Sequence, residues 1–409
     1  MLATGLEGRA ETPDSHAGAP IRYNAGMSLP APSSDALAAS HALQHLIAAD
    51  IARHSGAISF ARFMELALYA PDLGYYSGGA AKLGKDGDFT TAPEMTPLFG
   101  AALAHAAAAI MAQSAPHILE FGAGTGKLAR DILTELAAAG VAVERYAIVE
   151  LSGELRARQE QALADFPQVV WLDAMPEACD GVVIGNEVLD AMPVQLISKT
   201  PAGWCELHVT VTDGRFAYVE VAADAALLAQ IARQIADADA LPIGYVSEVH
   251  GTACGFMASL ARMLAAGKGG AALLFDYGFP AHEYYFEQRA AGTLMCHYRH
   301  HAHADPFYLP GLQDITAHVD FTAMALAAQD HGVDVLGYLN QAGFLIGAGI
   351  GELLLRTDPA DARAYLPQAS ALHKLVSPAE MGELFKVLVV GQGVALPEAI
   401  ALHDRSHRL

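Results

Sequence analysis

A glycine-rich segment, Gly122-Ala123-Gly124-Thr125-Gly126, directly follows the short apolar run His117–Phe121. Glycine lets a backbone turn tightly and approach a ligand without an intervening Cβ atom. The G-x-G-x-G spacing is one residue shorter than the G-x-G-x-x-G of dinucleotide-binding loops, so the segment alone is a weak signal. It indicates a nucleoside-binding turn between a strand and a helix.

Two carboxylates stand at the ends of the next two apolar runs: Glu150, beside Leu151, and Asp173, beside Ala174. An ionised carboxylate can accept hydrogen bonds from both hydroxyls of a ribose, which suits Glu150. Asp173 is placed to receive an adenine amino group, with Ala174 as an apolar wall. Each acid alone could be an ordinary cap or turn residue. Glycines and acids at three successive strand ends together favour a nucleoside site.

A third polar segment, Asn186-Glu187-Val-Leu-Asp190, follows the apolar run Val182–Ile184. Its carboxylates stand between apolar residues, so their burial must be offset by partners. A guanidinium is a suitable partner, because its planar fork pairs bidentately with carboxylates. In parallel sheets that bind a nucleoside-containing cofactor, this loop lies over the reactive end of that cofactor. The alternative is that Asp190 caps the next helix.

These segments belong to a β-then-α rhythm, which predicts a mainly parallel sheet with helices on both faces. The expected fold is therefore α/β and Rossmann-like. Strands are expected at 117–121, 146–149, 169–172, 182–184, 271–275, 333–336 and 385–390, and helices at 37–70, 96–112, 127–139, 154–163 and 321–329. Alternating residues around Thr212-Asp-Gly214 predict an inserted antiparallel hairpin.

The chain divides into six expected parts. They are a flexible tail (1–36), an N-terminal helical and loop region (37–112), the first half of the ligand-binding core (113–193), an insertion with the hairpin and helices (194–265), the second half of the core (266–395) with a covering loop at 278–320, and a C-terminal tail (396–409).

Composition excludes several classes of protein. With 24 basic and 45 acidic residues the formal charge is −21, which weighs against a nucleic-acid partner. No apolar run reaches the roughly 20 residues of a membrane span, and the start of the chain lacks a targeting pattern, so we expect a soluble cytoplasmic protein. Four dispersed cysteines predict free thiols, and the irregular spacing of His297, His300, His301 and His303 argues against a metal site.

Several motifs, in this order, resemble the MidA-type class I methyltransferases, which include the mitochondrial arginine methyltransferase needed for assembly of respiratory complex I. They are Gly74-Tyr-Tyr, Gly87-Asp-Phe-Thr-Thr-Ala-Pro-Glu94, Glu120 to Gly126, Asn186-Glu187 with Asp190-Ala and Pro193, Asp276-Tyr-Gly278, and Gln313-Asp-Ile-Thr-Ala-His-Val-Asp-Phe321. The resemblance spans about Ala49 to Gly391 and implies an S-adenosylmethionine cofactor. The cofactor-binding residues expected are Glu120, Gly122, Ala123, Gly124, Gly126, Glu150, Leu151, Asp173, Ala174 and Asn186.

The resemblance also implies an acceptor pocket built from Asn186, Glu187 and the segment Gln313–Asp320. We expect methylation of arginine in a protein partner, since the characterised mitochondrial member modifies a complex I subunit. Because a guanidinium is fully protonated near neutral pH, Glu187 is expected to clamp it and take a proton. The expected second acid is Asp190, Glu94 or Asp314.

His318 could orient the target group or be a structural histidine, and Gln313 is an expected acceptor contact. Two alternatives to arginine methylation stay open. One is methylation of a hydroxyl or amine on a small molecule, and the other is a non-catalytic cofactor-binding assembly factor. The alanine-rich helices expected at 96–112 and 223–237 could pack internally or form the interface of a homodimer.

Overall fold

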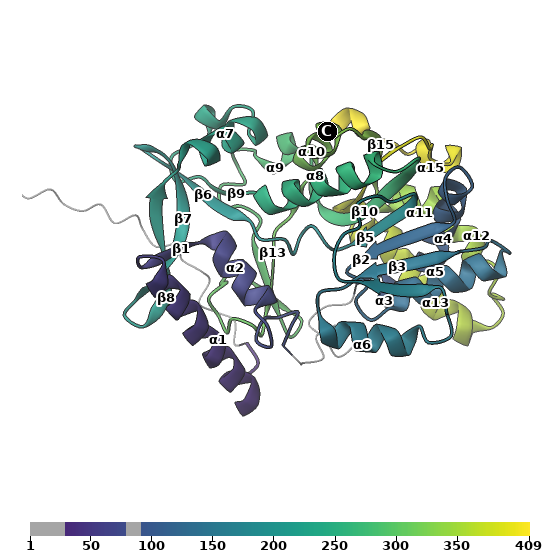
Figure 1. Cartoon of the computed structure of the whole chain (residues 1–409), viewed down its shortest axis with the longest axis horizontal. Helices are drawn as coiled ribbons and strands as arrows, with labels where there is room; N and C mark the ends of the chain where they lie inside the picture. Colours follow the sequence, from purple (N-terminus) through teal and green to yellow (C-terminus); the bar gives the residue numbers. More distant parts are fainter. Residues whose placement is uncertain (1–28, 79–90) are drawn as a thin grey trace, which may run out of the picture.

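The computed structural model describes residues 29–78 and 91–409. Most of the expected tail and the motif residues 87–90 lie outside these ranges. Figure 1 shows a large sheet with helices on one side of the molecule, and a smaller sheet with two N-terminal helices on the other side. No helix of the described ranges is long and apolar enough to cross a membrane.

The large sheet confirms the expected Rossmann-like fold. The strand order is β15-β16-β10-β5-β2-β3-β4, and the short β14 pairs with the end of β10. The strands from β10 to β4 are parallel, whereas β16 runs antiparallel to both of its neighbours. The bounds are β2 His117–Phe121, β3 Arg145–Val149, β4 Val169–Leu172, β5 Gly181–Asn186, β10 Gly270–Phe279, β14 Val319–Asp320, β15 Asp334–Asn340 and β16 Phe385–Gln392.

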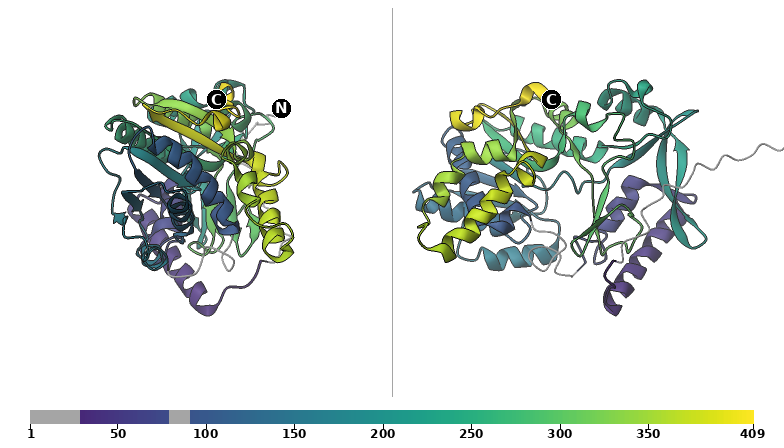
Figure 2. Two further views of the ribbon diagram at one scale, coloured as in Figure 1. Left: turned by 90° about the vertical axis from the view of Figure 1, so that its right-hand side faces the viewer. Right: turned by 180° about the vertical axis from the view of Figure 1, so that it is seen from behind.

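Helices cover both faces of this sheet, as its hydrophobic strands require. One face packs against α4 (Pro97–Met111), α5 (Lys127–Ala138) and the C-terminal helices α11 (Gln341–Gly347), α12 (Ile350–Leu354) and α13 (Ala362–Val376). The opposite face packs against α8 (Gly251–Ala265) and α10 (Phe321–Gln329). The right-hand view of Figure 2 shows the C-terminal helices, in yellow-green, in front of the sheet.

The order of strands reverses between β2 and β5. From β2 the chain proceeds outward to β3 and β4, and it then returns to place β5 on the other side of β2. Ligands of open parallel sheets bind at such a point, beyond the carboxyl ends of the strands. The glycine turn after β2 and the Asn186–Asp190 segment after β5 therefore face the same space.

The helical region expected over 37–70 is divided by a short strand. It forms α1 (Ser34–Arg53), a short strand β1 (Ala57–Ser59) and α2 (Phe60–Tyr69). Helix α1 begins inside the expected tail, because the hydroxyl of Ser33 accepts a hydrogen bond from the amide of Ala36 and caps it. The helix ends where Ser55 and Gly56 adopt positive φ angles of 61° and 95°, which turn the chain into β1.

The insertion contains the expected hairpin as part of a five-stranded antiparallel sheet. Strands β6 (Gln195–Thr200), β7 (Gly203–Thr212), β8 (Arg215–Ala222) and β9 (Val246–Val249) join β1, and the hairpin turn lies at Asp213 and Gly214. Helices α1 and α2 pack on this sheet, and α7 (Ala225–Gln234) with η1 (Ala238–Ala240) packs beside it. The N-terminal region and the insertion thus share one core.

Two other segments expected to lack regular structure are more ordered. Residues 278–320 contain α9 (Ala281–Tyr284) and a three-stranded sheet of β11 (Met295–Tyr298), β12 (His301–His303) and β13 (Asp314–Thr316). In the expected C-terminal tail, α15 (Glu398–Ala401) buries Ile400 and is followed by η2 (Ser406–Arg408). Arg405 between them forms an ion pair with Glu383 of α14 (Met381–Leu384), so side-chain contacts hold this end of the chain.

A substitution at Gly181, the first residue of β5, tests how tightly the central strands pack. Its φ angle is +105°, and an added Cβ would lie 2.3 Å from the carbonyl oxygen of His117. We expect Gly181→Ala to destabilise the protein by more than about 2 kcal/mol, because strain and a backbone clash add. Gly255→Ala in α8, where a Cβ meets no atom within 4 Å, should stabilise it by up to about 1 kcal/mol. Equal melting temperatures of the two variants would contradict this account.

Candidate active site

The glycine turn has the backbone that its sequence predicts. Gly122, Gly124 and Gly126 have φ angles of 64°, 53° and 81°, a region in which other residues are strained. A Cβ on Gly122 would approach Cγ2 of Val188 to 3.3 Å. The turn therefore brings its main chain close to the segment after β5. Ala123 within the turn is buried.

Glu120 lies in β2 immediately before this turn and is buried. Its carboxylate accepts a hydrogen bond from the hydroxyl of Tyr146 in β3 at 2.7 Å. Burial raises the pKa of Glu120 to about 7, although the hydrogen bond from Tyr146 opposes the shift. This hydrogen bond links β2 and β3, the two strands that precede the glycine turn and Glu150.

Glu150 follows β3 and lies beyond the end of the strand, as expected. Its Oε1 accepts from the amide of Ser152 at 2.9 Å, and its Oε2 accepts from Nε2 of Gln159 at 2.8 Å. Each oxygen keeps a lone pair for another donor. Burial raises the pKa of Glu150, and both hydrogen bonds counteract the rise. The carboxylate is thus fixed in orientation but free to accept two further hydroxyls.

The surface beside Glu150 is open. The side chain of Leu151 is 80% exposed, an unusual state for a large apolar residue next to a buried turn. Asp173 and Ala174 after β4 are also exposed. The side chain of Asp173 is 92% exposed and forms an ion pair with Arg156 at 2.9 Å. In the structure the partner of Asp173 is therefore Arg156, a residue of the helix that follows Glu150.

The segment after β5 carries backbone strain at a carboxylate. Glu187 has a φ angle of 54°, which is uncommon for a residue other than glycine and marks functional sites. Its carboxylate accepts hydrogen bonds from the side-chain amide of Asn186, at 3.1 Å, and from the amide of Ala92. Burial raises the pKa of Glu187 to about 8, and the charges of Asp190 and Asp314 add to the rise.

Asp190 and Asp276 form a second, deeper pair of acids. Asp276 in β10 accepts hydrogen bonds from the amides of Leu189 at 2.8 Å and Asp190 at 3.3 Å. Burial raises the pKa values of both carboxyls above their usual range, and the hydroxyl of Tyr277 opposes the shift at Asp190. Asp276 thereby holds the segment that presents Glu187 and Asp190.

Asp314, the first residue of β13, lies close enough to Glu187 for its charge to raise the pKa of that residue. Both of its carboxylate oxygens accept from the hydroxyl of Tyr76 at 3.0 Å. The ring of Tyr76 stacks on Tyr69 of α2, with centroids 5.5 Å apart and an interplanar angle of 26°. The Tyr69 hydroxyl donates to the carbonyl oxygen of Ala191 at 2.9 Å. Three separate parts of the chain therefore meet around the acids.

The structure gives the other expected acceptor residues more local roles. Nε2 of Gln313 donates to the carbonyl oxygens of Asp305 and Pro306, so this buried amide holds its own turn. Glu94, in the four-residue helix α3 (Ala92–Met95), accepts from the hydroxyl of Thr125 at 2.5 Å. That contact attaches α3 to the glycine turn.

His318 lies one layer behind the acids. Its ring stacks on Phe279 at 5.3 Å and meets the edge of Tyr277 at 5.0 Å. Burial lowers the pKa of His318 to about 4, with the charge of Arg289 adding to the effect, so the imidazole is neutral at physiological pH. Its Nδ1 has no hydrogen-bond partner among the described residues. His318 contacts Tyr277, and Tyr277 in turn hydrogen-bonds Asp190.

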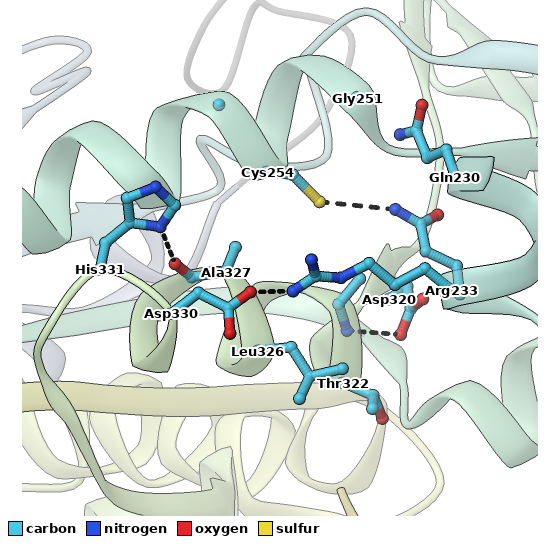
Figure 3. Close-up of a pocket in the computed structure, with 13 residues that line it drawn as sticks. Gln230, Arg233, Gly251, Cys254, Asp320, Thr322, Leu326, Ala327, Asp330 and His331 are labelled. Carbon is cyan, nitrogen blue, oxygen red and sulfur yellow. Dashed lines mark hydrogen bonds and ion pairs between the residues drawn. The ribbon is translucent and has the colours of Figure 1, made fainter. Parts of the chain in front are cut away.

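A cavity of about 370 Å³ lies elsewhere, between α7, α8 and α10 (Figure 3). Arg233 and Asp330 form an ion pair across it, and Asp320 contributes to its wall. Asp320 caps α10 by accepting from the amide of Ala323. Asp320, the second-last residue of the motif 313–321, therefore lines this cavity, whereas Asp314 binds Tyr76 near Glu187.

Comparison with known proteins decides the family. Residues 99–339 match the family model of S-adenosyl-L-methionine-dependent methyltransferases. The chain belongs to this family. S-adenosylmethionine is its cofactor, and the glycine turn, the free lone pairs of Glu150 and the exposed Leu151 fit an adenosyl ligand.

The structure is similar to that of a Burkholderia thailandensis protein crystallised with S-adenosyl-homocysteine, with a TM-score of 0.88 and 52% identity over 93% of this chain and 100% of that one. The sequence is 29% identical over 390 residues, 85% of this chain and 86% of the relative, to the mitochondrial protein arginine methyltransferase NDUFAF7 of Danio rerio. The corresponding Caenorhabditis elegans homologue is 29% identical over 75% of this chain and 76% of its own length. The expectation of a cytoplasmic location is wrong, because these relatives are named as mitochondrial proteins.

Several residues of the site were not singled out from the sequence. Asp276 and Tyr76 lie in motifs of the resemblance, but only the fold shows what they contact. Gln159 gave no sequence signal, since it stands in a helix of mostly polar residues. The histidines of β11 and β12 lie on a hairpin whose turn residues Arg299 and His300 have positive φ angles. The four cysteines are free thiols.

Cofactor binding should depend on the ionised form of Glu150. We expect Glu150→Gln to raise the dissociation constant for S-adenosylhomocysteine by about ten- to one hundredfold, the usual cost of losing a charged hydrogen-bond acceptor. Because its pKa is raised, the affinity of the unmodified protein should fall as the pH is lowered towards that pKa, and the variant should lose this dependence. Calorimetric titration between pH 5 and 8 measures both effects. Glu154→Gln, in the first turn of the helix that follows Glu150, is the control, and equal behaviour of the two variants would refute the role.

Proposed function

We propose that the protein is a protein arginine N-methyltransferase. The observation that carries the proposal is the meeting of Glu187, Asp190 and Asp314 beside the cofactor end of β5. Neither Glu187 nor Asp190 has a Lys or Arg partner within the described part of the chain. Three close acids in a partly buried site attract a cationic acceptor. The relatives named as protein arginine methyltransferases support the same acceptor.

Unpartnered acceptor atoms point to a ligand that carries several N–H donors. Oδ1 of Asn186 and Oδ1 of Asp190 are buried and lack hydrogen-bond partners among residues 29–78 and 91–409. A buried acceptor without a donor costs about 1–3 kcal/mol. A guanidinium has five N–H donors in one plane, so it can serve both atoms and Glu187 together. An ammonium has three donors on one atom and is less suited to acceptors spread over a plane.

Tyr69 and Tyr76 supply an aromatic wall in this proposal. Flat cations stack on aromatic faces, and the hydroxyls of both rings are already fixed by Ala191 and Asp314. The side chains therefore pay little further conformational entropy when a guanidinium binds. The protein partner itself is identified only as one that presents an arginine side chain.

The proposed chemistry follows from the acids. Bound S-adenosylmethionine supplies an electrophilic methyl group. Glu187 orients the guanidinium, draws positive charge away from the attacking nitrogen and receives the proton that this nitrogen loses. A carboxylate whose pKa is about 8 is a stronger base than an ordinary glutamate. This pKa is also close to physiological pH, which suits a group that must both accept and release a proton. Asp190 stabilises the remaining charge, and His318 keeps Tyr277 in place beside Asp190.

We assign the cofactor to the residues at the ends of β2, β3, β4 and β5. Glu150 takes the ribose, Leu151 and Ala174 the adenine faces, and Asp173 its amino group after release from Arg156. The glycine turn and Asn186 lie along the remainder of the cofactor. The residues in this assignment are Glu120, Gly122, Ala123, Gly124, Gly126, Glu150, Leu151, Asp173, Ala174 and Asn186.

Glu187→Gln separates chemistry from cofactor binding. The amide keeps the size of the side chain but cannot accept a proton, so we expect methyl transfer to fall at least one hundredfold. Affinity for S-adenosylhomocysteine should change less than twofold. The assay uses an arginine-containing peptide library with labelled cofactor and mass spectrometry, and Glu144→Gln on the surface is the control. Full turnover by Glu187→Gln, or methyl groups found only on other side chains, would rule the proposal out.

The pH profile of the unmodified enzyme should report the same carboxyl. Burial raises the pKa of Glu187 to about 8, so below that pH the base is mostly protonated. We expect kcat/KM to increase about tenfold per pH unit up to this pKa and then to level. The rise should be absent from the residual activity of Glu187→Gln. A profile that is flat from pH 6 to 9 would show that no group of this pKa acts in the free enzyme.

A further inference from the structure

Helix α6 (Gly153–Ala162) is a polar helix on the surface, and its one fully buried side chain is Gln159. A primary amide removed from water needs partners for all its polar atoms. The helix provides none of them. The partners come from the turn after β2, the end of β3 and strand β4, which are the three elements that carry the cofactor residues.

Three hydrogen bonds use both N–H donors and the oxygen of the amide. Its Nε2 donates to the carbonyl oxygen of Gly124 at 3.0 Å and to Oε2 of Glu150 at 2.8 Å. Its Oε1 accepts from the indole Nε1 of Trp171 at 3.0 Å. Since two acceptors face one end and a donor faces the other, only one orientation of the amide satisfies all three partners.

This arrangement acts on Glu150 in two ways. The hydrogen bond occupies one lone pair of Oε2 and fixes the carboxylate plane, while the amide of Ser152 does the same for Oε1. The bond also favours the ionised form, against the effect of burial. The same NH2 group holds the carbonyl of Gly124 in a turn whose φ angles are positive. One side chain thus sets both the ribose acceptor and the glycine turn.

We propose that Gln159 is a positioning residue for S-adenosylmethionine, acting through Glu150 and Gly124, and that Trp171 senses the state of this contact. The inference rests on the cofactor residues assigned above and does not depend on the methyl acceptor. A failure of arginine methylation would therefore leave it intact, because it is tested by cofactor binding alone.

The first test compares two glutamines of one helix. Gln159→Leu removes the donors to Glu150 and Gly124, and Gln161→Leu changes an exposed residue two positions away. We expect the dissociation constant for S-adenosylhomocysteine to rise by about ten- to one hundredfold in Gln159→Leu and by less than twofold in Gln161→Leu. Circular dichroism and the melting temperature establish that each variant is folded. A folded Gln159→Leu protein that binds within twofold of the original overturns the proposal.

Gln159→Glu provides a second test that keeps the size of the side chain. The new carboxyl can donate to Glu150 only when protonated, and ionised it repels that residue. Affinity for S-adenosylhomocysteine should therefore rise at least fivefold as the pH is lowered from 8 to 6, opposite in sign to the unmodified protein. A merely structural role would not produce this rescue. If Gln159→Leu does not fold, this variant decides, and the same pH dependence as in the unmodified protein overturns the proposal.

Trp171 supplies a spectroscopic readout. The chain has two tryptophans, and Trp204→Phe leaves Trp171 as the only tryptophan, which is excited selectively at the red edge of the absorption band. Gln159→Leu in that background removes the acceptor of the indole N–H, so the emission maximum should shift. S-adenosylhomocysteine should change the emission of the parent protein more than that of the variant. Identical spectra and identical ligand responses would show that Trp171 does not sense the contact.

Discussion

The carboxylate of Asp276 is the contact on which the rest of the site depends. Its Oδ2 accepts hydrogen bonds from the amides of Leu189 and Asp190, and its Oδ1 accepts one from the amide of Tyr277 at 3.0 Å. The segment held in this way offers its own carbonyl groups to other parts of the chain. The carbonyl of Asp190 accepts from Ala317, and that of Ala191 accepts from Tyr69. The central sheet, the β11–β13 sheet and the N-terminal helices are therefore joined at one buried acid.

Crowding of acids at this point has a cost. Burial raises the pKa values of Glu187, Asp190 and Asp276, and the charge of Asp190 adds to the rise at the other two. A carboxyl whose pKa is higher in the folded than in the unfolded state binds more protons when folded. Its contribution to stability is present at low pH and is lost as the pH rises through the folded pKa. A bound cation offsets this loss, so the same feature that weakens the empty protein favours a positively charged ligand.

Sequence patterns predict the parallel sheet and the helices that cover it, but they do not predict the contacts among the acids after β5. The β-then-α rhythm predicts the order of β2, β3, β4 and β5, since each pairs with a neighbour close in the sequence or follows a known crossover. The positions of Glu150 and Asp190 follow directly from that order. The contact of Tyr76 with Asp314 joins residues that are 238 positions apart, and no periodicity encodes it. Gln159 escaped notice because burial of one polar side chain in a polar helix is a property of the tertiary structure alone.

That 238-residue separation also sets an order of events during synthesis. The strands and turns of the proposed cofactor site, from His117 to Asn186, form a nearly continuous stretch of chain and can assemble early. Tyr76 leaves the ribosome before them, yet its hydroxyl has no acceptor until Asp314 is synthesised. At about 5–20 residues per second, the delay is roughly 10–50 s. During this interval the core shared by the N-terminal helices and the insertion lacks the side chains that β11 and β13 later contribute, Cys296 and Ile315.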